Sequence, residues 1–357
     1  MSRTVAGARL RVGWSVLRTP ALACTLLAAW LAAVEVVART DTVRAWLPAP
    51  SVGSTNRQFE VQLSRLDRFA EREGAIDSLF IGSSVVCRAI DPITVSSAYH
   101  QRTEHDLHGF SFGVNGMGAP TSGLMAEILV AQYHPKVLIF GTSPFDYLPS
   151  GPGRAAIESS PWLQYRRGHS TLAGWLTTYS LAYRYYLTHR AWRGPRFWSD
   201  LQRAQRVEKY ISAYGFGFDP RPPWRGRKGS GRRSDHPATF EITRDARDGL
   251  ARIAQLHQHG LRVIVVEVPV QNQAIDALPG GEQGYRSFVE ALERYATEQR
   301  IPFWPTRSLN LIPPDGWRNQ GHVNVVGARS FSRWLGERLA TDDLNPRAAD
   351  ALVVGDR

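Results

Sequence analysis

The chain has 357 residues, a formal net charge of +11, and 43% hydrophobic and 21% charged residues. This apolar content excludes collagen-like and wholly disordered proteins. Two cysteines, Cys24 and Cys87, exclude a disulfide framework and a cysteine-only zinc site. A chain of this length can bury a core without such staples, as one large domain or two ordinary ones.

One long apolar run, Ala21–Ala38, follows a basic tail (residues 1–19) with four arginines and no acidic residue. As a helix it spans roughly 27 Å, close to one hydrocarbon thickness. The positive charge before the run predicts that the N-terminus stays in the cytoplasm. We therefore predict a single-pass anchor over residues 20–38 in a bacterial inner membrane, with the rest of the chain periplasmic or extracellular. The alternatives are a cleaved signal peptide, with a weak cleavage site at 36–38, and a buried core helix.

Residues 39–74 are predicted to be a linker followed by a polar helix, in which Phe59, Leu63 and Leu66 recur at helical spacing. From residue 75 onward, short apolar runs alternate with helical patterns. The predicted strands are 77–82, 109–114, 136–141, 261–268 and 301–304, and the predicted helices are 121–133, 243–260, 287–299 and 326–339. Strands joined by crossover helices predict an α/β fold, a three-layer α/β/α sandwich with a parallel sheet, formed by residues 75–150 and 240–340.

Residues 151–239 interrupt this alternation and are rich in Trp, Tyr, Arg, Gly and Pro, so we predict an insertion, part helix and part loop. Between Arg190 and Arg233 twelve Lys or Arg stand against three acidic residues. Three interpretations of this basic stretch are open: a solvated loop, a contact for anionic lipid headgroups or an acidic glycan, and a nucleic-acid site. The predicted export of the chain disfavours the nucleic-acid site. The tail, 341–357, has no periodic stripe and is predicted to be mobile.

Four short segments fall at predicted strand ends or before the last helix, where ligands bind in open α/β sheets. They are residues 79–92, 112–120, 140–146 and 318–331. Together they resemble the SGNH, or GDSL-type, hydrolase superfamily. Its membrane-anchored members include O-acetyl esterases and O-acetyltransferases of polysaccharides.

The resemblance implies roles for individual residues. Gly82-Ser83-Ser84 stands where the family has Gly-Asp-Ser, which puts Ser84 at the nucleophile's place. Gly116 matches the glycine whose backbone N–H helps to hold the oxyanion, and Ser143 replaces the family's oxyanion asparagine. Asn319 and His322 stand at the two ends of the family's Asp-x-x-His block, so the triad acid is replaced by an amide.

The chemistry fits these residue types. A serine hydroxyl becomes nucleophilic when a nearby base takes its proton, and His322 is the natural base for Ser84. The N–H groups of Ser84 and Gly116, with the Ser143 hydroxyl or Asn115, are the predicted oxyanion donors.

An amide at Asn319 can accept the imidazole N–H through its oxygen but carries no charge. A backbone carbonyl, leaving a Ser–His dyad, or Asp315 from the preceding turn are the other ways to orient the ring. The histidines show no metal-ligand spacing, and we expect neither a metal nor another cofactor.

The predicted function is a serine acyl-ester hydrolase or O-acyltransferase acting on an acylated carbohydrate of the cell envelope or a secreted carbohydrate. The alternative is a non-catalytic SGNH-like binding or assembly subunit of an envelope polysaccharide machinery, which the replaced asparagine and aspartate of the family favour.

Overall fold

The computed structural model of the protein describes residues 6–149, 151–191, 197–218 and 240–344. Five parallel strands form one sheet in the order β2-β1-β3-β4-β5, which confirms the predicted parallel sheet. The strands are β1 (Ser78–Gly82), β2 (Gly109–Gly113), β3 (Val137–Thr142), β4 (Arg262–Glu267) and β5 (Phe303–Trp304).

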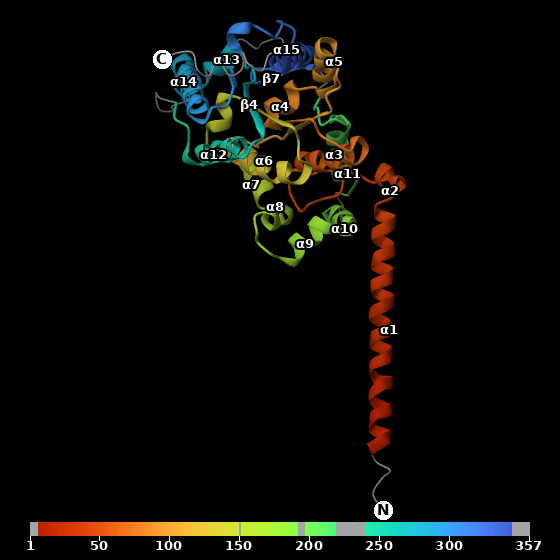
Figure 1. Ribbon diagram of the computed structural model, residues 1–357. Coiled ribbons are helices and arrows are strands. Elements are labelled where there is room, and N and C mark those ends of the chain that lie inside the picture. The colour runs from red at the N-terminus through yellow and green to blue at the C-terminus, as the bar shows by residue number, and fades with distance from the viewer. Residues whose placement is uncertain (1–5, 150, 192–196, 219–239, 345–357) are drawn as a thin grey trace, which may run out of the picture.

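Helices cover both faces of this sheet, because successive side chains of a strand point to opposite faces. Leu79 and Ile81 of β1 pack into the core on one face, while Phe80 packs on the other. The first face is covered by α3 (Arg57–Glu73), α6 (Ala119–Tyr133), α12 (Arg244–Gln258) and α14 (Gly281–Gln299). The second face is covered by α4 (Ser84–Ala89), α5 (Pro92–Thr103) and α15 (Val325–Leu344). The predicted three-layer sandwich is therefore confirmed (Figure 1).

The strand order creates a crevice at one point of the sheet. The chain leaves β1 toward β2 on one side and reaches β3 on the other, so the carboxyl ends of β1 and β3 flank the topological switch point. Gly82 ends β1 and Gly141 is the last residue but one of β3, because α4 passes close over both. A Cβ on Gly82 would lie 2.3 Å from the carbonyl oxygen of Gly141 and 2.4 Å from Val86 of α4. Side chains at these two glycines would push the start of α4 away from the sheet.

The N-terminal helix α1 (Ala6–Ala38) extends away from the globular body and is followed by the short α2 (Asp41–Trp46) (Figure 1). Its segment Thr19–Ala38 is long and apolar enough to cross a membrane, and only 6% of it is buried. A membrane anchor and a signal sequence both satisfy this description.

In its described residues, 151–191 and 197–218, the predicted insertion contains five helices. They are α7 (Pro152–Glu158), α8 (Pro161–Arg166), α9 (Leu172–Tyr179), α10 (Leu181–Ala191) and α11 (Phe197–Lys209). Its first part joins the main core, because Ile157 and Leu163 are fully buried with the side chains of the first face. Eight of the twelve basic residues of the stretch predicted to bind anionic lipid or glycan lie outside the described residues.

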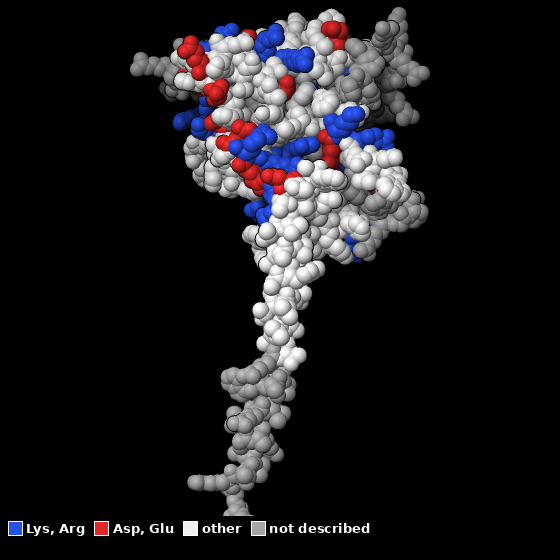
Figure 2. All heavy atoms as spheres, turned by 90° about the vertical axis from the view of Figure 1, so that its right-hand side faces the viewer, with Lys and Arg blue, Asp and Glu red and all other residues white. Residues whose placement is uncertain are grey.

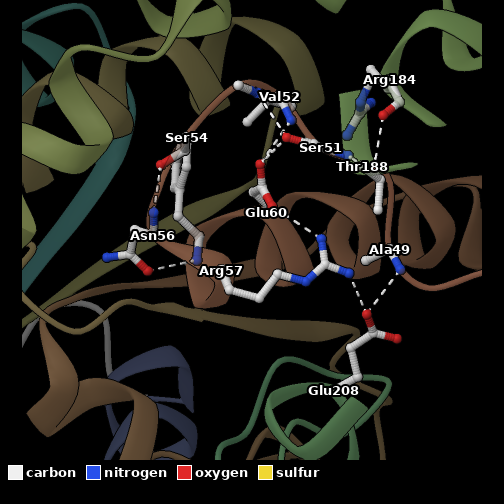
Figure 3. Close-up of polar contacts among 12 residues, drawn as sticks. Ala49, Ser51, Val52, Ser54, Asn56, Arg57, Glu60, Arg184, Thr188 and Glu208 are labelled. Atoms are coloured by element: carbon white, nitrogen blue, oxygen red, sulfur yellow. Dashed lines mark hydrogen bonds and ion pairs between the residues drawn. The ribbon is translucent and has the colours of Figure 1, made fainter. Parts of the chain in front are cut away.

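A buried group of polar side chains ties the linker before α3 to the insertion. Glu60, only 4% exposed, accepts hydrogen bonds from the Ser51 hydroxyl and the Val52 N–H and pairs with Arg57 (Figure 3). Arg57 also pairs with Glu208 of α11. We call Ser51, Arg57, Glu60 and Glu208 the Glu60 cluster. Burial raises the pKa of Glu60, and the Arg57 guanidinium opposes that shift.

Some elements differ from the predictions. The last helix ends at Leu344, five residues beyond the predicted Leu339, because Asp342 and Asp343 pair with Arg262 of β4. The first residues of the predicted mobile tail are therefore helical, and residues 345–357 lie outside the described part. A two-stranded antiparallel hairpin, β6 (Trp317–Asn319) and β7 (His322–Val323), was not predicted. The remaining short elements are η1 (Pro144–Tyr147), α13 (Asn272–Ile275) and η2 (Arg307–Leu309).

Candidate active site

Ser84 and His322 lie in direct contact although 238 residues separate them. Ser84 is the first residue of α4, directly after β1, and the Ser83 hydroxyl caps this helix. His322 begins β7, in the hairpin that precedes α15. The distance from Ser84 Oγ to His322 Nε2 is 2.8 Å. The structure therefore brings the predicted nucleophile and base within proton-transfer distance, while their catalytic roles stay predictions.

Asn319 fixes which nitrogen of His322 carries the proton. Its Oδ1 lies 3.0 Å from the Gly321 N–H and 3.0 Å from His322 Nδ1. Because a backbone N–H only donates, the atom facing Gly321 has to be the amide oxygen. The same oxygen then accepts from Nδ1–H, which leaves Nε2 as the acceptor for the Ser84 hydroxyl. This is the tautomer that a general base requires.

The two other predicted ways of orienting the ring are not seen among the described residues. Asp315 accepts a hydrogen bond from Asn324 through its backbone carbonyl, and no hydrogen bond joins it to His322. The partner of Nδ1 is a side-chain amide rather than a backbone carbonyl.

Ser84 and His322 line a cavity of about 440 Å³ at the crevice. Gly116 lines the same cavity from the turn after β2. Its φ of +81° favours glycine, and a Cβ there would lie 2.8 Å from the Cα of Gly153 at the start of α7. The N–H of Ser84, at the first position of its helix, has no intrahelical acceptor. Both predicted backbone donors thus belong to residues that border the open space.

The two remaining oxyanion candidates have other partners. The Ser143 N–H and hydroxyl both donate to Asp146 Oδ2, at 2.8 and 3.1 Å. The Asn115 N–H donates to Gln58, and its carbonyl accepts from Asn56. The role predicted for the Ser143 hydroxyl would require it to leave Asp146.

Asp146 is a wall residue of the cavity that the sequence predictions missed. It is 6% exposed, and the hydroxyl of Ser83 also hydrogen-bonds to its carboxylate. Burial raises the pKa of Asp146 to about 6, against the hydrogen bonds from Ser83 and Ser143 that lower it. A carboxylate therefore lies beside position 83, where the resembling family has its own aspartate. The Ser143-x-x-Asp146 spacing, a capping-box pattern, is the signal that could have revealed it.

His322 is held in its neutral form. Burial lowers the pKa of His322 to about 4, with a further contribution from the nearby Arg88 guanidinium. A neutral imidazole can accept a proton from Ser84 throughout the physiological range. Because Asn319 carries no charge, nothing in the pair raises the basicity of the ring as a carboxylate would.

The described residues contain no group of three or more His, Cys, Asp or Glu side chains placed to hold a metal ion. The structure does place a hydroxyl, an imidazole, an amide that orients it and two backbone N–H groups around one cavity.

No protein-family model matches the chain, and no curated protein matches it. Among solved structures, a candidate acylhydrolase from Bacteroides fragilis aligns with a TM-score of 0.36 at 11% identity, over 81% of this chain and 97% of that one. A gut microbial diltiazem-metabolizing enzyme aligns with a TM-score of 0.37 at 8% identity, over 74% of this chain and 47% of that one. A lipase from a goat rumen metagenome aligns with a TM-score of 0.34 at 8% identity, over 74% and 97%. These alignments are too loose to carry an argument about function, which therefore rests on the site itself.

Proposed function

We propose that this protein is a serine acyl-ester hydrolase or O-acyltransferase that acts on an acylated carbohydrate of the cell envelope or a secreted carbohydrate. The observation that carries the proposal is the 2.8 Å contact between Ser84 Oγ and His322 Nε2, with Asn319 fixing the tautomer.

The proposed reaction has two halves. Ser84 Oγ attacks the acyl carbon as its proton passes to His322 Nε2, and the N–H groups of Ser84 and Gly116 bind the resulting oxyanion. When the intermediate collapses, the ester C–O bond breaks and His322 returns the proton to the departing alcohol. Water then takes the acyl group from Ser84 in hydrolysis, and a sugar hydroxyl takes it in transfer.

The carbohydrate substrate and the membrane tether come from the resemblance and from α1. A contact between α1 and the body supports an anchor that is kept rather than cleaved. Glu35, near the end of α1, accepts hydrogen bonds from the N–H groups of Leu181 and Ala182 at the start of α10. Cleavage after Ala38 would remove this cap from α10.

A non-catalytic binding subunit is the second candidate, and two observations favour it. Asn319 is uncharged, and the Ser143 hydroxyl is bound to Asp146. The first weakens the triad and the second removes an oxyanion donor, but both leave a polar cavity able to hold an acyl sugar.

Labelling with a fluorophosphonate separates the two candidates. The full chain, purified in mild detergent, should react once, at Ser84. The Ser84→Ala variant should lose the label, and Ser97→Ala, which removes an exposed hydroxyl on α5, should keep it. If the folded chain does not react and does not hydrolyse a chromogenic acetyl ester, the binding role replaces the enzymatic one.

A further inference from the structure

The end of the body nearest to α1 carries an uncharged helix with an exposed apolar face. Residues 170–183 contain no Asp, Glu, Lys or Arg. Within them, Leu172, Trp175 and Tyr179 of α9 recur at helical spacing and are 73%, 48% and 54% exposed. Scattered apolar residues on a surface need no explanation, but a stripe of large ones on an uncharged helix indicates a contact surface.

The start of α10, directly after α9, is bound to α1. Glu35 of α1 accepts hydrogen bonds from the Ser180 hydroxyl (2.9 Å) and from the N–H groups of Leu181 (2.9 Å) and Ala182 (3.1 Å). Arg39 pairs with Glu35 at 2.7 Å and donates to the Tyr179 carbonyl at 3.0 Å. The end of α9 is therefore held beside the last turn of α1, at the position of Glu35 and Arg39 along the helix axis.

That level lies inside the apolar span. Glu35 precedes Ala38, the last residue of the span, by three residues, or about 4.5 Å along the helix axis. A span of this length roughly equals the hydrocarbon thickness, so Glu35 lies at the inner edge of the interfacial layer. A carboxylate at this depth is costly unless it is paired. The donors from Ser180, Leu181 and Ala182 reach it only if the start of α10 lies at the same depth.

The arrangement of the molecule agrees with this level. In Figure 1, α9 is the lowest part of the globular body and lies level with the upper turns of α1. In Figure 2, charged residues gather in a band above the junction, whereas the part of α1 that extends below it is white.

We propose that α9 is a second membrane-contacting element, whose apolar face lies in the interfacial layer of the bilayer that α1 crosses. Trp and Tyr are the residues enriched in this layer, and a helix lying in it buries its apolar face at the headgroup boundary. The exposed Arg166 and Arg167, just before α9, suit the phosphates of the headgroups. Lipid is favoured over a protein partner because the end of α9 is hydrogen-bonded to Arg39, which directly follows the membrane-spanning helix. The inference rests on the proposed anchoring of α1.

Nitroxide labels on the full chain in vesicles of phosphatidylcholine with a minor share of phosphatidylglycerol test the proposal. Power saturation with oxygen and a nickel chelate then reports the depth of each label. Cys24, exposed in the middle of α1, serves as the bilayer control in the wild-type chain, while Cys87 is buried. In a Cys24→Ala background, Trp175→Cys and Leu172→Cys carry the test labels. Ile93→Cys is the aqueous control, because Ile93 is 54% exposed on α5, a helix that lies far from α1 in Figure 1.

Labels at 172 and 175 should show an oxygen-to-nickel accessibility ratio several-fold above that at 93 and below that at 24. If 172 and 175 match 93 while 24 lies in the bilayer, α9 does not contact the membrane, and its stripe serves a protein partner or a second copy. If the label at 24 is also aqueous, the anchoring itself fails.

Discussion

The Glu60 cluster and the candidate active site both gather polar side chains from distant segments, but they use them differently. In the Glu60 cluster, Ser51 and Arg57 surround a carboxylate that is 4% exposed, and the groups bind one another (Figure 3). At the candidate active site, Ser84 and His322 bind each other on one side and border a cavity of about 440 Å³ on the other.

The difference separates structural from functional polar groups. Buried polar atoms that hydrogen-bond to one another stabilise a unique arrangement of segments and have no hydrogen-bonding capacity left for a ligand. Atoms that face open space can exchange a partner for a substrate. Asp146 shows that one site can contain both kinds, because it lines the cavity while its carboxylate binds Ser83 and Ser143.

The largest expected difference between the two sites comes from removing His322, the predicted base. His322→Ala should lower the rate of ester hydrolysis about 10³-fold, since positioned acid–base catalysis contributes 10²–10⁴, and should change the Tm of the full chain little. His105→Ala, which removes an exposed histidine, should leave both unchanged. An unchanged rate in His322→Ala would place the chemistry elsewhere.

Removing Glu60 should have the reverse effect, lowering the stability of the protein but not its rate of ester hydrolysis. Glu60→Ala removes the acceptor of the buried Ser51 hydroxyl and Val52 N–H and leaves Arg57 with Glu208 as its remaining carboxylate, and should cost about 3 kcal/mol of the free energy of unfolding. The matched control, Glu71→Ala, breaks the pair of Arg44 with an exposed carboxylate and should cost less than about 1 kcal/mol. Thermal unfolding in detergent measures both, and activity per folded molecule should stay at the wild-type level. Equal losses in the two variants would contradict the structural role of the cluster.

The two titrating groups of the cavity should give stability opposite dependences on pH. The pKa of Asp146 rises on folding from 3.8 to about 6, so between these values the folded state holds the extra proton and its contribution to stability falls as pH rises. The pKa of His322 falls from 6.5 to about 4, so the unfolded state holds the extra proton and stability rises with pH. Each slope is at most about 1.4 kcal/mol per pH unit.

Between pH 4 and 6 the two contributions oppose each other, so the free energy of unfolding of the wild type should change little with pH. In the Asp146→Asn variant the free energy of unfolding should rise with pH over this range, and in the His322→Gln variant it should fall. Identical profiles in all three proteins would mean that neither group titrates as the burial of the site requires.

The smallest expected effect comes from restoring a charge. Asn319→Asp places a carboxylate on His322 Nδ1–H, which should raise the pKa of His322 above about 4 and the rate about tenfold. The acidic limb of kcat/KM against pH reports the first change, and the rate at neutral pH reports the second. Asn310→Asp, on an exposed turn with no hydrogen bond to the ring, should alter neither. A variant with an unchanged acidic limb would show that Asn319 does not orient the base.

Much of the fold could be predicted because it follows local patterns. The β-branched run defines β4 within a few residues, as do Gly82 at the end of β1 and Gly141 next to the end of β3. The order of the strand-end segments also predicted that Ser84 and His322 share one rim, because the carboxyl ends of parallel strands meet at one edge.

Features that depend on partners far apart in the chain could not be predicted in this way. The last helix continues to Leu344 because of Arg262, some eighty residues earlier, and helical periodicity carries no information about such a pair. The contact of Glu35 with α10 joins segments 146 residues apart. The capping-box spacing of Ser143 and Asp146 predicts their contact, but the burial of Asp146 in the cavity wall depends on the packing of the layers, which the spacing does not contain.

The close approach of Gly116 and Gly153 constrains how this protein can evolve. A side chain at Gly153 would meet the Cα of Gly116 at 3.0 Å and press on the turn that carries a predicted oxyanion donor. Position 153 lies in the insertion, where sequence drift is ordinarily tolerated. It should nevertheless stay glycine in any descendant that keeps this turn, since a single added methyl group there would displace Gly116 at the wall of the cavity.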